Sequence, residues 1–220
     1  MKYSSVFEII GPVMVGPSSS HTAGALVIGR LARKMFGRKP DQAMITLYGS
    51  FANTYHGHGT DIAIVGGILD LDTNDEKVIQ SFELAQQMGI NIQFELSEIQ
   101  KRHPNTAQIE LSDAHGKLVI VGISLGGGKV QIISVNGFEL NLTGESPTLL
   151  VLHEDRAGMI AKVAGLLGNH NINIGHMEVS RKDRGSEALM AIETDQLVSE
   201  ELMREIEDMT HILMVSGFTC

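Results

Sequence analysis

The spacing of apolar residues predicts a mixed α/β arrangement over the first part of the chain. Between residues 20 and 36, small or apolar side chains recur every third or fourth position, which is typical of a helix with one buried stripe. A serine at position 18, 19 or 20 can cap this helix, and Gly37 can end it. Residues 43–51 then predict a strand, and residues 60–69 and 74–88 predict two further helices.

From residue 90 the pattern changes to a period of two, which is typical of strands. Residues 90–96 alternate apolar and polar side chains, as a half-buried strand does. Turn sequences at 113–116 and at Asn136-Gly137 separate β-rich runs, and the Asn-Gly pair favours a type I′ hairpin. The run Gly126-Gly127-Gly128 lacks the features of a P-loop or a dinucleotide fingerprint, so we interpret it as a tight connection between strands.

A polar, turn-forming stretch at residues 144–147 predicts a linker between two domains. After it the pattern reads strand, helix, strand, strand, helix, strand, which is a ferredoxin-like βαββαβ plan. The expected helices of this second part span residues 159–169 and 199–209. The chain is therefore predicted to be an α+β protein with one domain at 1–143 and another at 148–220.

Charge narrows the classes of function. The chain of 220 residues carries 17 Lys and Arg against 26 Asp and Glu, a formal net charge of −9. Its basic residues gather in one place, which we interpret as a solvated face or a subunit contact rather than a nucleic-acid site. These residues are Arg30, Arg33, Lys34, Arg38 and Lys39. No apolar run is long enough for a membrane span and the N-terminus lacks a signal-peptide pattern, so we expect a cytoplasmic protein.

The cysteine content limits the cofactors. The chain has one cysteine, Cys220, to which we assign no role. A disulfide within the chain is therefore excluded. An iron–sulfur cluster usually needs three or four thiolate ligands, so this chain cannot hold one alone.

The most distinctive motif is Gly16-Pro17-Ser18-Ser19-Ser20-His21-Thr22, at the start of the first expected helix. Helix N-termini present unpaired N–H groups and a partial positive charge, which suit a carboxylate or a phosphate. The hydroxyls add hydrogen-bond donors, and His21 can carry a proton. The alternative is a serine-rich cap with an incidental histidine. Capping needs only one hydroxyl, but the spacing alone leaves both interpretations open.

A second polar constellation spans residues 48–61, from the end of the strand expected at 43–51. A glycine-flanked His58 precedes Thr60 and Asp61, which can cap the next helix. His56 and His58 with Asp61 could suggest a metal site, but zinc requires three or four ligands in a fixed geometry, so the cap is favoured. A third polar turn, His103-Pro104-Asn105-Thr106, is ambiguous by itself.

In this order, and followed by Ile123-Ser124-Leu125 and the three glycines, these motifs resemble the beta chain of bacterial two-subunit iron–sulfur L-serine dehydratases. The resemblance covers essentially the whole chain. It implies an alternative side-chain-binding (ASB) domain followed by an ACT domain, and conversion of L-serine to pyruvate and ammonia. It also implies that an alpha-chain partner holds a four-iron, four-sulfur cluster, so no metal ligand is expected in this chain.

The resemblance also suggests roles for individual residues. His21 is expected to handle a proton or to orient the substrate, although the group that takes the Cα proton could also lie on the alpha chain. His56 lies outside the Gly-His-Gly-Thr-Asp core and receives no role. The residues expected to bind or enclose L-serine are Ser18, Ser19, Ser20, Thr22, His58, Thr60, Asp61 and Asn105.

Residues 152–159 and 169–174 resemble the two loops of ACT modules near which amino acids bind between paired modules. Gly158, Asn171 and Asn173 are therefore candidate effector contacts, and self-association through this domain is expected. Asparagine also serves left-handed turns and helix C-caps, so dimerisation without an effector is the alternative. The alternative for the whole chain is an amino-acid sensor without catalytic duty.

Overall fold

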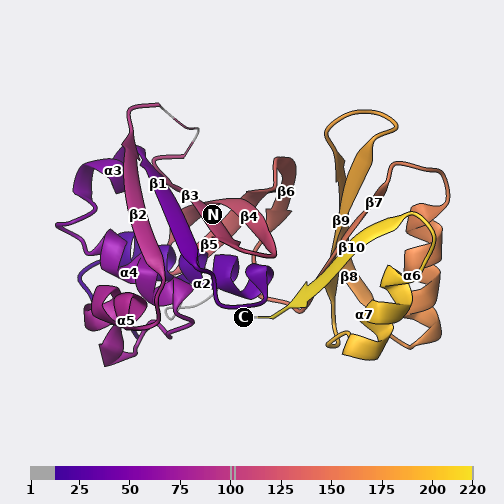
Figure 1. The fold of residues 1–220 in the computed structure, drawn as a ribbon, viewed down its shortest axis with the longest axis horizontal. Coiled ribbons are helices and arrows are strands. Elements are labelled where there is room, and N and C mark those ends of the chain that lie inside the picture. The colour runs from indigo at the N-terminus through magenta and orange to yellow at the C-terminus, as the bar shows by residue number, and fades with distance from the viewer. Residues whose placement is uncertain (1–12, 100, 102, 220) are drawn as a thin grey trace. The chain divides into compact units, whose positions relative to one another are not determined.

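The chain forms two compact units, Met1–Ile133 and Ser134–Cys220, in a computed structural model that describes residues 13–99, 101 and 103–219 (Figure 1). A six-stranded sheet has the order β2-β1-β3-β4-β5-β6. Strand β1 pairs in parallel with β2 and antiparallel with β3. The strands are β1 (Gln42–Tyr48), β2 (Asn91–Ser97), β3 (Asn105–Asp113), β4 (Gly116–Gly126), β5 (Lys129–Val135) and β6 (Phe138–Leu142).

Two helices of the first unit, α2 (Gly24–Phe36) and α4 (Thr60–Ile68), pack against each other with their backbones in contact. A Cβ added at Gly67 would lie 2.0 Å from the carbonyl oxygen of Leu26, and one added at Gly29 would lie 2.3 Å from that of Ile64. Only glycine permits this approach. The starts of the two helices are also joined, because the Thr22 hydroxyl donates to the backbone oxygen of His58 at 2.8 Å.

The turns predicted for the first unit are confirmed. Gly37 ends α2 in the left-handed conformation, at φ 74°. The three glycines at 126–128 connect β4 to β5, all with positive φ. At the start of the second unit, Asn136 and Gly137, with φ of 48° and 82°, join β5 to β6 as a type I′ turn requires.

Two expected elements differ from those observed. The strand predicted at 43–51 ends at Tyr48, and α3 (Gly49–Thr54) follows, because Gly49 has φ 55° and Ser50 donates its backbone N–H to Pro104. The helix predicted at 74–88 is divided into a 3-10 helix (Glu76–Gln80) and α5 (Ser81–Gln87). At the junction, the buried Ser81 hydroxyl donates to the carbonyl of Ile62.

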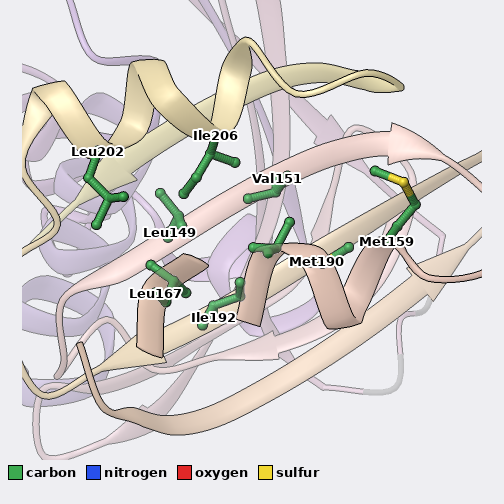
Figure 2. Close-up of a cluster of buried hydrophobic side chains, with 9 residues drawn as sticks. Leu149, Val151, Met159, Leu167, Met190, Ile192, Leu202 and Ile206 are labelled. Atoms are coloured by element: carbon green, nitrogen blue, oxygen red, sulfur yellow. The ribbon is translucent and has the colours of Figure 1, made fainter. Parts of the chain in front are cut away.

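The second unit has the predicted βαββαβ order. Its elements are β7 (Thr148–Glu154), α6 (Met159–Asn169), β8 (Ile174–Arg181), β9 (Glu187–Thr194), α7 (Glu200–Glu207) and β10 (Ile212–Phe218). The four strands form a sheet of order β10-β7-β9-β8. Figure 2 shows the core between this sheet and the two helices, where Val151 and Ile192 from strands meet Leu167 and Ile206 from helices. Strand β7 begins directly after the stretch 144–147 proposed as a linker.

None of the helices within residues 13–99, 101 and 103–219 combines the length and the apolar character that a membrane span needs.

Candidate functional site

The chain enters α2 through a π-helical turn, Ser19–Ala23. The Ser18 hydroxyl accepts a hydrogen bond from the backbone N–H of His21 at 3.2 Å, so the predicted serine cap is confirmed. The Ser18 carbonyl accepts two more, from Thr22 at 2.8 Å and from Ala23 at 3.2 Å. Ser18 therefore stabilises the turn that carries His21. Because the backbone N–H groups of this turn already donate to Ser18, they are not free to bind an anion.

The imidazole of His21 lies half-buried between two serine hydroxyls. Its Nδ1 is 3.0 Å from the Oγ of Ser20, and its Nε2 is 2.9 Å from the Oγ of Ser50. The rings of Phe51 and His58 lie beside it, with centroids at 5.5 and 4.8 Å. Either hydroxyl can donate or accept, so both neutral tautomers of the ring are compatible with these contacts.

Two effects lower the pKa of His21 below its ordinary value. Burial, which disfavours the charged imidazolium, is the larger, and the nearby His58 adds electrostatic repulsion. The ring is therefore neutral at neutral pH, with one nitrogen that can accept a proton.

Two residues after His58, whose ring lies beside His21, α4 begins at Thr60. Thr60 is fully buried, and its hydroxyl has no hydrogen-bond partner among the described residues. The Nδ1 of His58 is also buried and unpaired within this part of the chain. Buried polar groups are normally satisfied, so these two atoms are candidates for contact with a bound molecule.

The cap expected from Thr60 and Asp61 is not observed: α4 begins after Gly59, at φ 63°, without a side-chain cap, and Asp61 makes other contacts within the chain. One carboxylate oxygen accepts from the backbone N–H of Ile62 at 2.9 Å, and the other lies 2.8 Å from the Nδ1 of His56. The side chain of Asp61 is 8% exposed, whereas that of His56 is 73% exposed. His56, for which no role was expected, is therefore the direct partner of Asp61.

The turn at residues 103–106 lies next to Ser50. Its Pro104 carbonyl accepts from the backbone N–H of Ser50 at 2.8 Å, and Asn105 forms a β-bridge with Gly49. Within the turn, the Thr106 hydroxyl donates a hydrogen bond to the carbonyl oxygen of His103 at 2.6 Å. The structure thus brings the three sequence motifs together through His21, Ser50 and Pro104.

Ser50 is a site residue of the second constellation for which the sequence suggested no role. It lies inside the run 43–51, whose apolar character predicted a strand passing straight through it. The signal that could have found it is Gly49, which permits the chain to turn at positive φ and so directs Ser50 toward the histidine.

The donor atoms near His21 do not suit an iron–sulfur cluster. They are hydroxyls and imidazoles, whereas such clusters are held by thiolates. Among residues 13–99, 101 and 103–219, no group of three or more His, Cys, Asp or Glu side chains is arranged to hold a metal ion. Cys220 lies outside the described residues.

The candidate effector residues of the second unit lie in its loops. Gly158, at φ 88°, precedes α6, and Asn171, at φ 57°, forms the left-handed turn that follows it. The side-chain amide of Asn173 donates to Asp195 at 2.6 Å. Each position has a backbone or loop-fixing contact of its own, and effector binding stays a prediction.

The basic residues near the end of α2 are mostly paired with aspartates of the same chain, which reduces the charge available to an outside phosphate. Arg30 contacts Asp70 and Asp72, and Lys34 lies 2.8 Å from Asp70. Arg38 binds both carboxylate oxygens of Asp113 and lowers the pKa of that group well below its usual range. This pattern agrees with the interpretation of a solvated face.

Residues 5–87 match the family described as serine dehydratase beta chain, and residues 147–210 match the ACT domain. A relative from Bacillus subtilis (strain 168), named probable L-serine dehydratase, beta chain, is 53% identical over 216 residues, 98% of each chain. The L-serine dehydratase beta chain of Peptoniphilus asaccharolyticus is 38% identical over 92% of each chain. A D-3-phosphoglycerate dehydrogenase from Synechocystis sp. is 25% identical over 183 residues, 83% of this chain and 33% of its own length. With relatives of this identity over nearly its full length, the chain belongs to the family of L-serine dehydratase beta chains.

Proposed function

We propose that this beta chain contributes the proton-handling and substrate-orienting half of an active site that is active only together with an alpha chain. The observation that carries the proposal is His21, a half-buried imidazole whose two nitrogens contact the hydroxyls of Ser20 and Ser50. In this proposal the four-iron, four-sulfur cluster belongs to the alpha chain, in keeping with the thiolate-free surroundings of His21.

Deamination of L-serine begins with loss of a proton from Cα and of hydroxide from Cβ. The resulting enamine tautomerises to an imine, which water hydrolyses to pyruvate and ammonia. A neutral His21 is suited to accept the Cα proton, because its lowered pKa keeps a nitrogen lone pair available at neutral pH. The hydroxyl of Ser20 or Ser50 can rotate and free that nitrogen.

The predicted substrate-binding residues divide into two groups. Ser18 and Thr22 make hydrogen bonds that shape the loop, and Asp61 is bound to the start of α4 and to His56. The remaining groups are proposed to hold the substrate's carboxylate or hydroxyl; they are Ser19, Ser20, His58, Thr60 and Asn105. Thr60 is the best supported, since its buried hydroxyl is unpaired in the described part of the chain.

The finer domain assignments are part of the same proposal. The first domain is proposed to be of the ASB type, with its boundary at 144–147. The match to D-3-phosphoglycerate dehydrogenase supports a recurring two-domain arrangement, because its 183 residues exceed either compact unit. The ACT domain is proposed to self-associate and to bind an amino-acid effector near Gly158, Asn171 and Asn173. A cytoplasmic location completes the proposal.

The test is reconstitution with the alpha chain in the absence of oxygen, measuring pyruvate formed from L-serine. We expect no pyruvate from the isolated beta chain and none from a complex that carries His21→Asn, with assembly intact by size-exclusion chromatography. His115→Asn, at an exposed turn between β3 and β4, is the matched control and should keep the wild-type rate. An active isolated chain would overturn the divided site, and full turnover by His21→Asn would remove His21 from the mechanism.

A further inference from the structure

Beneath the turn that carries His21, α2 approaches β4 more closely than any residue other than glycine permits. A Cβ added at Gly24 would lie 2.1 Å from the Oγ of Ser124 and 2.8 Å from its Cβ. Gly24 itself has ordinary helical angles, φ −62° and ψ −38°. The glycine is therefore required by lack of space and not by backbone conformation.

Ser124 is a fully buried residue near the end of β4, and its hydroxyl has no hydrogen-bond partner among the described residues. An unpaired buried hydroxyl costs free energy, so hydrogen bonding does not explain why Ser124 lies against the helix. The structural role of Ser124 is to pack its side chain against Gly24.

The other end of the turn rests on the same hairpin. The backbone oxygen of Ser19 accepts from the N–H of Gly24, which closes the π-turn, and from the N–H of Gly128 at 3.3 Å. Ser124 and Gly128 belong to β4 and to the glycine connection that follows it. The hairpin thus supports both ends of the turn, and His21 projects from between them toward Ser50.

We propose that Gly24 and Ser124 are positioning residues for His21: their contact fixes how closely the Ser19–Ala23 turn lies on β4. The separation between this turn and β4 determines the distances from the His21 imidazole to Ser50 and His58. The inference deepens the proposed function and rests on it for the activity measurement, whereas the position of the ring can be measured without the alpha chain.

The geometry predicts a graded response to substitution. Gly24→Ala must move the turn by about 1 Å to relieve the contact, and a displacement of that size can lower turnover about a hundredfold. Adding Ser124→Ala removes the nearer atom but leaves the Cβ at 2.8 Å, so rescue is partial. Adding Ser124→Gly removes both atoms and should restore most of the loss.

The experiment compares these variants in two measurements. In the isolated full chain, the imidazole C–H resonances of His21 are titrated by NMR and assigned with His21→Asn. Gly24→Ala should raise the pKa of His21 toward its ordinary value and should change the ring's chemical shifts, and the Ser124→Gly double variant should reverse both changes. In the alpha–beta complex, Gly24→Ala should lower kcat about a hundredfold with a smaller effect on KM. The double variant should recover the rate of Ser124→Gly alone to within about threefold.

Gly165→Ala in α6 is the matched control, since a Cβ there meets no atom within 4 Å, and both measurements should stay at wild type. The proposal is overturned if Gly24→Ala leaves the titration and kcat unchanged, or if Ser124→Gly does not rescue it. If Gly24→Ala does not fold, rescue of folding and activity by Ser124→Gly supports the contact, and failure of the double variant overturns it. A wild-type complex without serine-dependent pyruvate would refute the proposed function while the NMR comparison still decides the positioning role.

Discussion

The close packing of α2 on α4 can be tested with two adjacent glycines that differ only in what they face. A Cβ at Gly67 would lie 2.0 Å from the oxygen of Leu26 and 2.6 Å from the nitrogen of Arg30, both backbone atoms of α2. A Cβ at Gly66 would meet the side chain of Val78 at 3.4 Å, an ordinary contact. Both glycines lie in α4, so the same Gly→Ala change has opposite packing consequences at neighbouring positions.

The magnitudes follow from two terms. Alanine is favoured over glycine in a helix interior by about 1 kcal/mol, so Gly66→Ala should raise the free energy of unfolding by up to that amount. At Gly67 the same gain is opposed by forcing two helix backbones apart. That cost should lie near the upper end of overpacking penalties, about 3 kcal/mol. The net expectation for Gly67→Ala is a loss of about 2 kcal/mol.

Urea unfolding followed by tyrosine fluorescence is the suitable assay. The chain has no tryptophan, and Tyr48 and Tyr55 lie in the first unit, so their fluorescence reports the unfolding of that unit. With ordinary urea dependence, a loss of about 2 kcal/mol lowers the midpoint by roughly 1 M. A midpoint for Gly67→Ala at or above wild type would refute the reasoning, and so would an equal loss in Gly66→Ala.

Three further predictions concern the site and the ACT domain. Ser50→Ala removes one hydrogen bond to His21 and should lower kcat about tenfold with assembly unchanged, as measured by pyruvate formation. In the proposed mechanism the neutral form of His21 accepts the Cα proton, so kcat/KM should fall as the pH drops through its lowered pKa. His58→Gln removes a repelling charge, so it should raise that pKa and move the acid limb of the pH profile to higher pH. At Asn171, where φ is 57°, Asn171→Ala should cost about 1 kcal/mol in urea unfolding followed by circular dichroism and Asn171→Gly much less; equal losses would contradict a left-handed turn.

Local patterns in the sequence were enough for most elements, because periodicity and turn residues act over short distances. The helix through Leu31, the strand through Ile45 and the Asn136-Gly137 turn all follow from neighbouring residues. The end of β1 cannot be predicted from neighbouring residues, because Phe51 continues the apolar run and is fully buried. The chain turns there because the carbonyl of Pro104, from a distant loop, accepts the N–H of Ser50. The His21–Ser50 contact depends on that turn, so the candidate site could be predicted only in part.

Most of the hydroxyls before α2 have hydrogen-bond partners within the chain. Ser18 caps the turn, Ser20 contacts His21, and the Thr22 hydroxyl is bonded to the backbone of His58. Ser19 is the member of this group whose side chain makes no hydrogen bond in the described part of the chain, although its carbonyl closes the turn.

The motif at residues 18–22 was expected to present free hydrogen-bond donors to an anion. Most of its hydroxyls instead hold the imidazole of His21 in position. In the proposed active site, the substrate's carboxylate would therefore be bound mainly by groups that the turn does not use, among them the buried hydroxyl of Thr60 at the start of α4. Substitutions of Ser18 and Thr22 should accordingly act through the placement of His21, and a substitution of Thr60 should act on the affinity for L-serine.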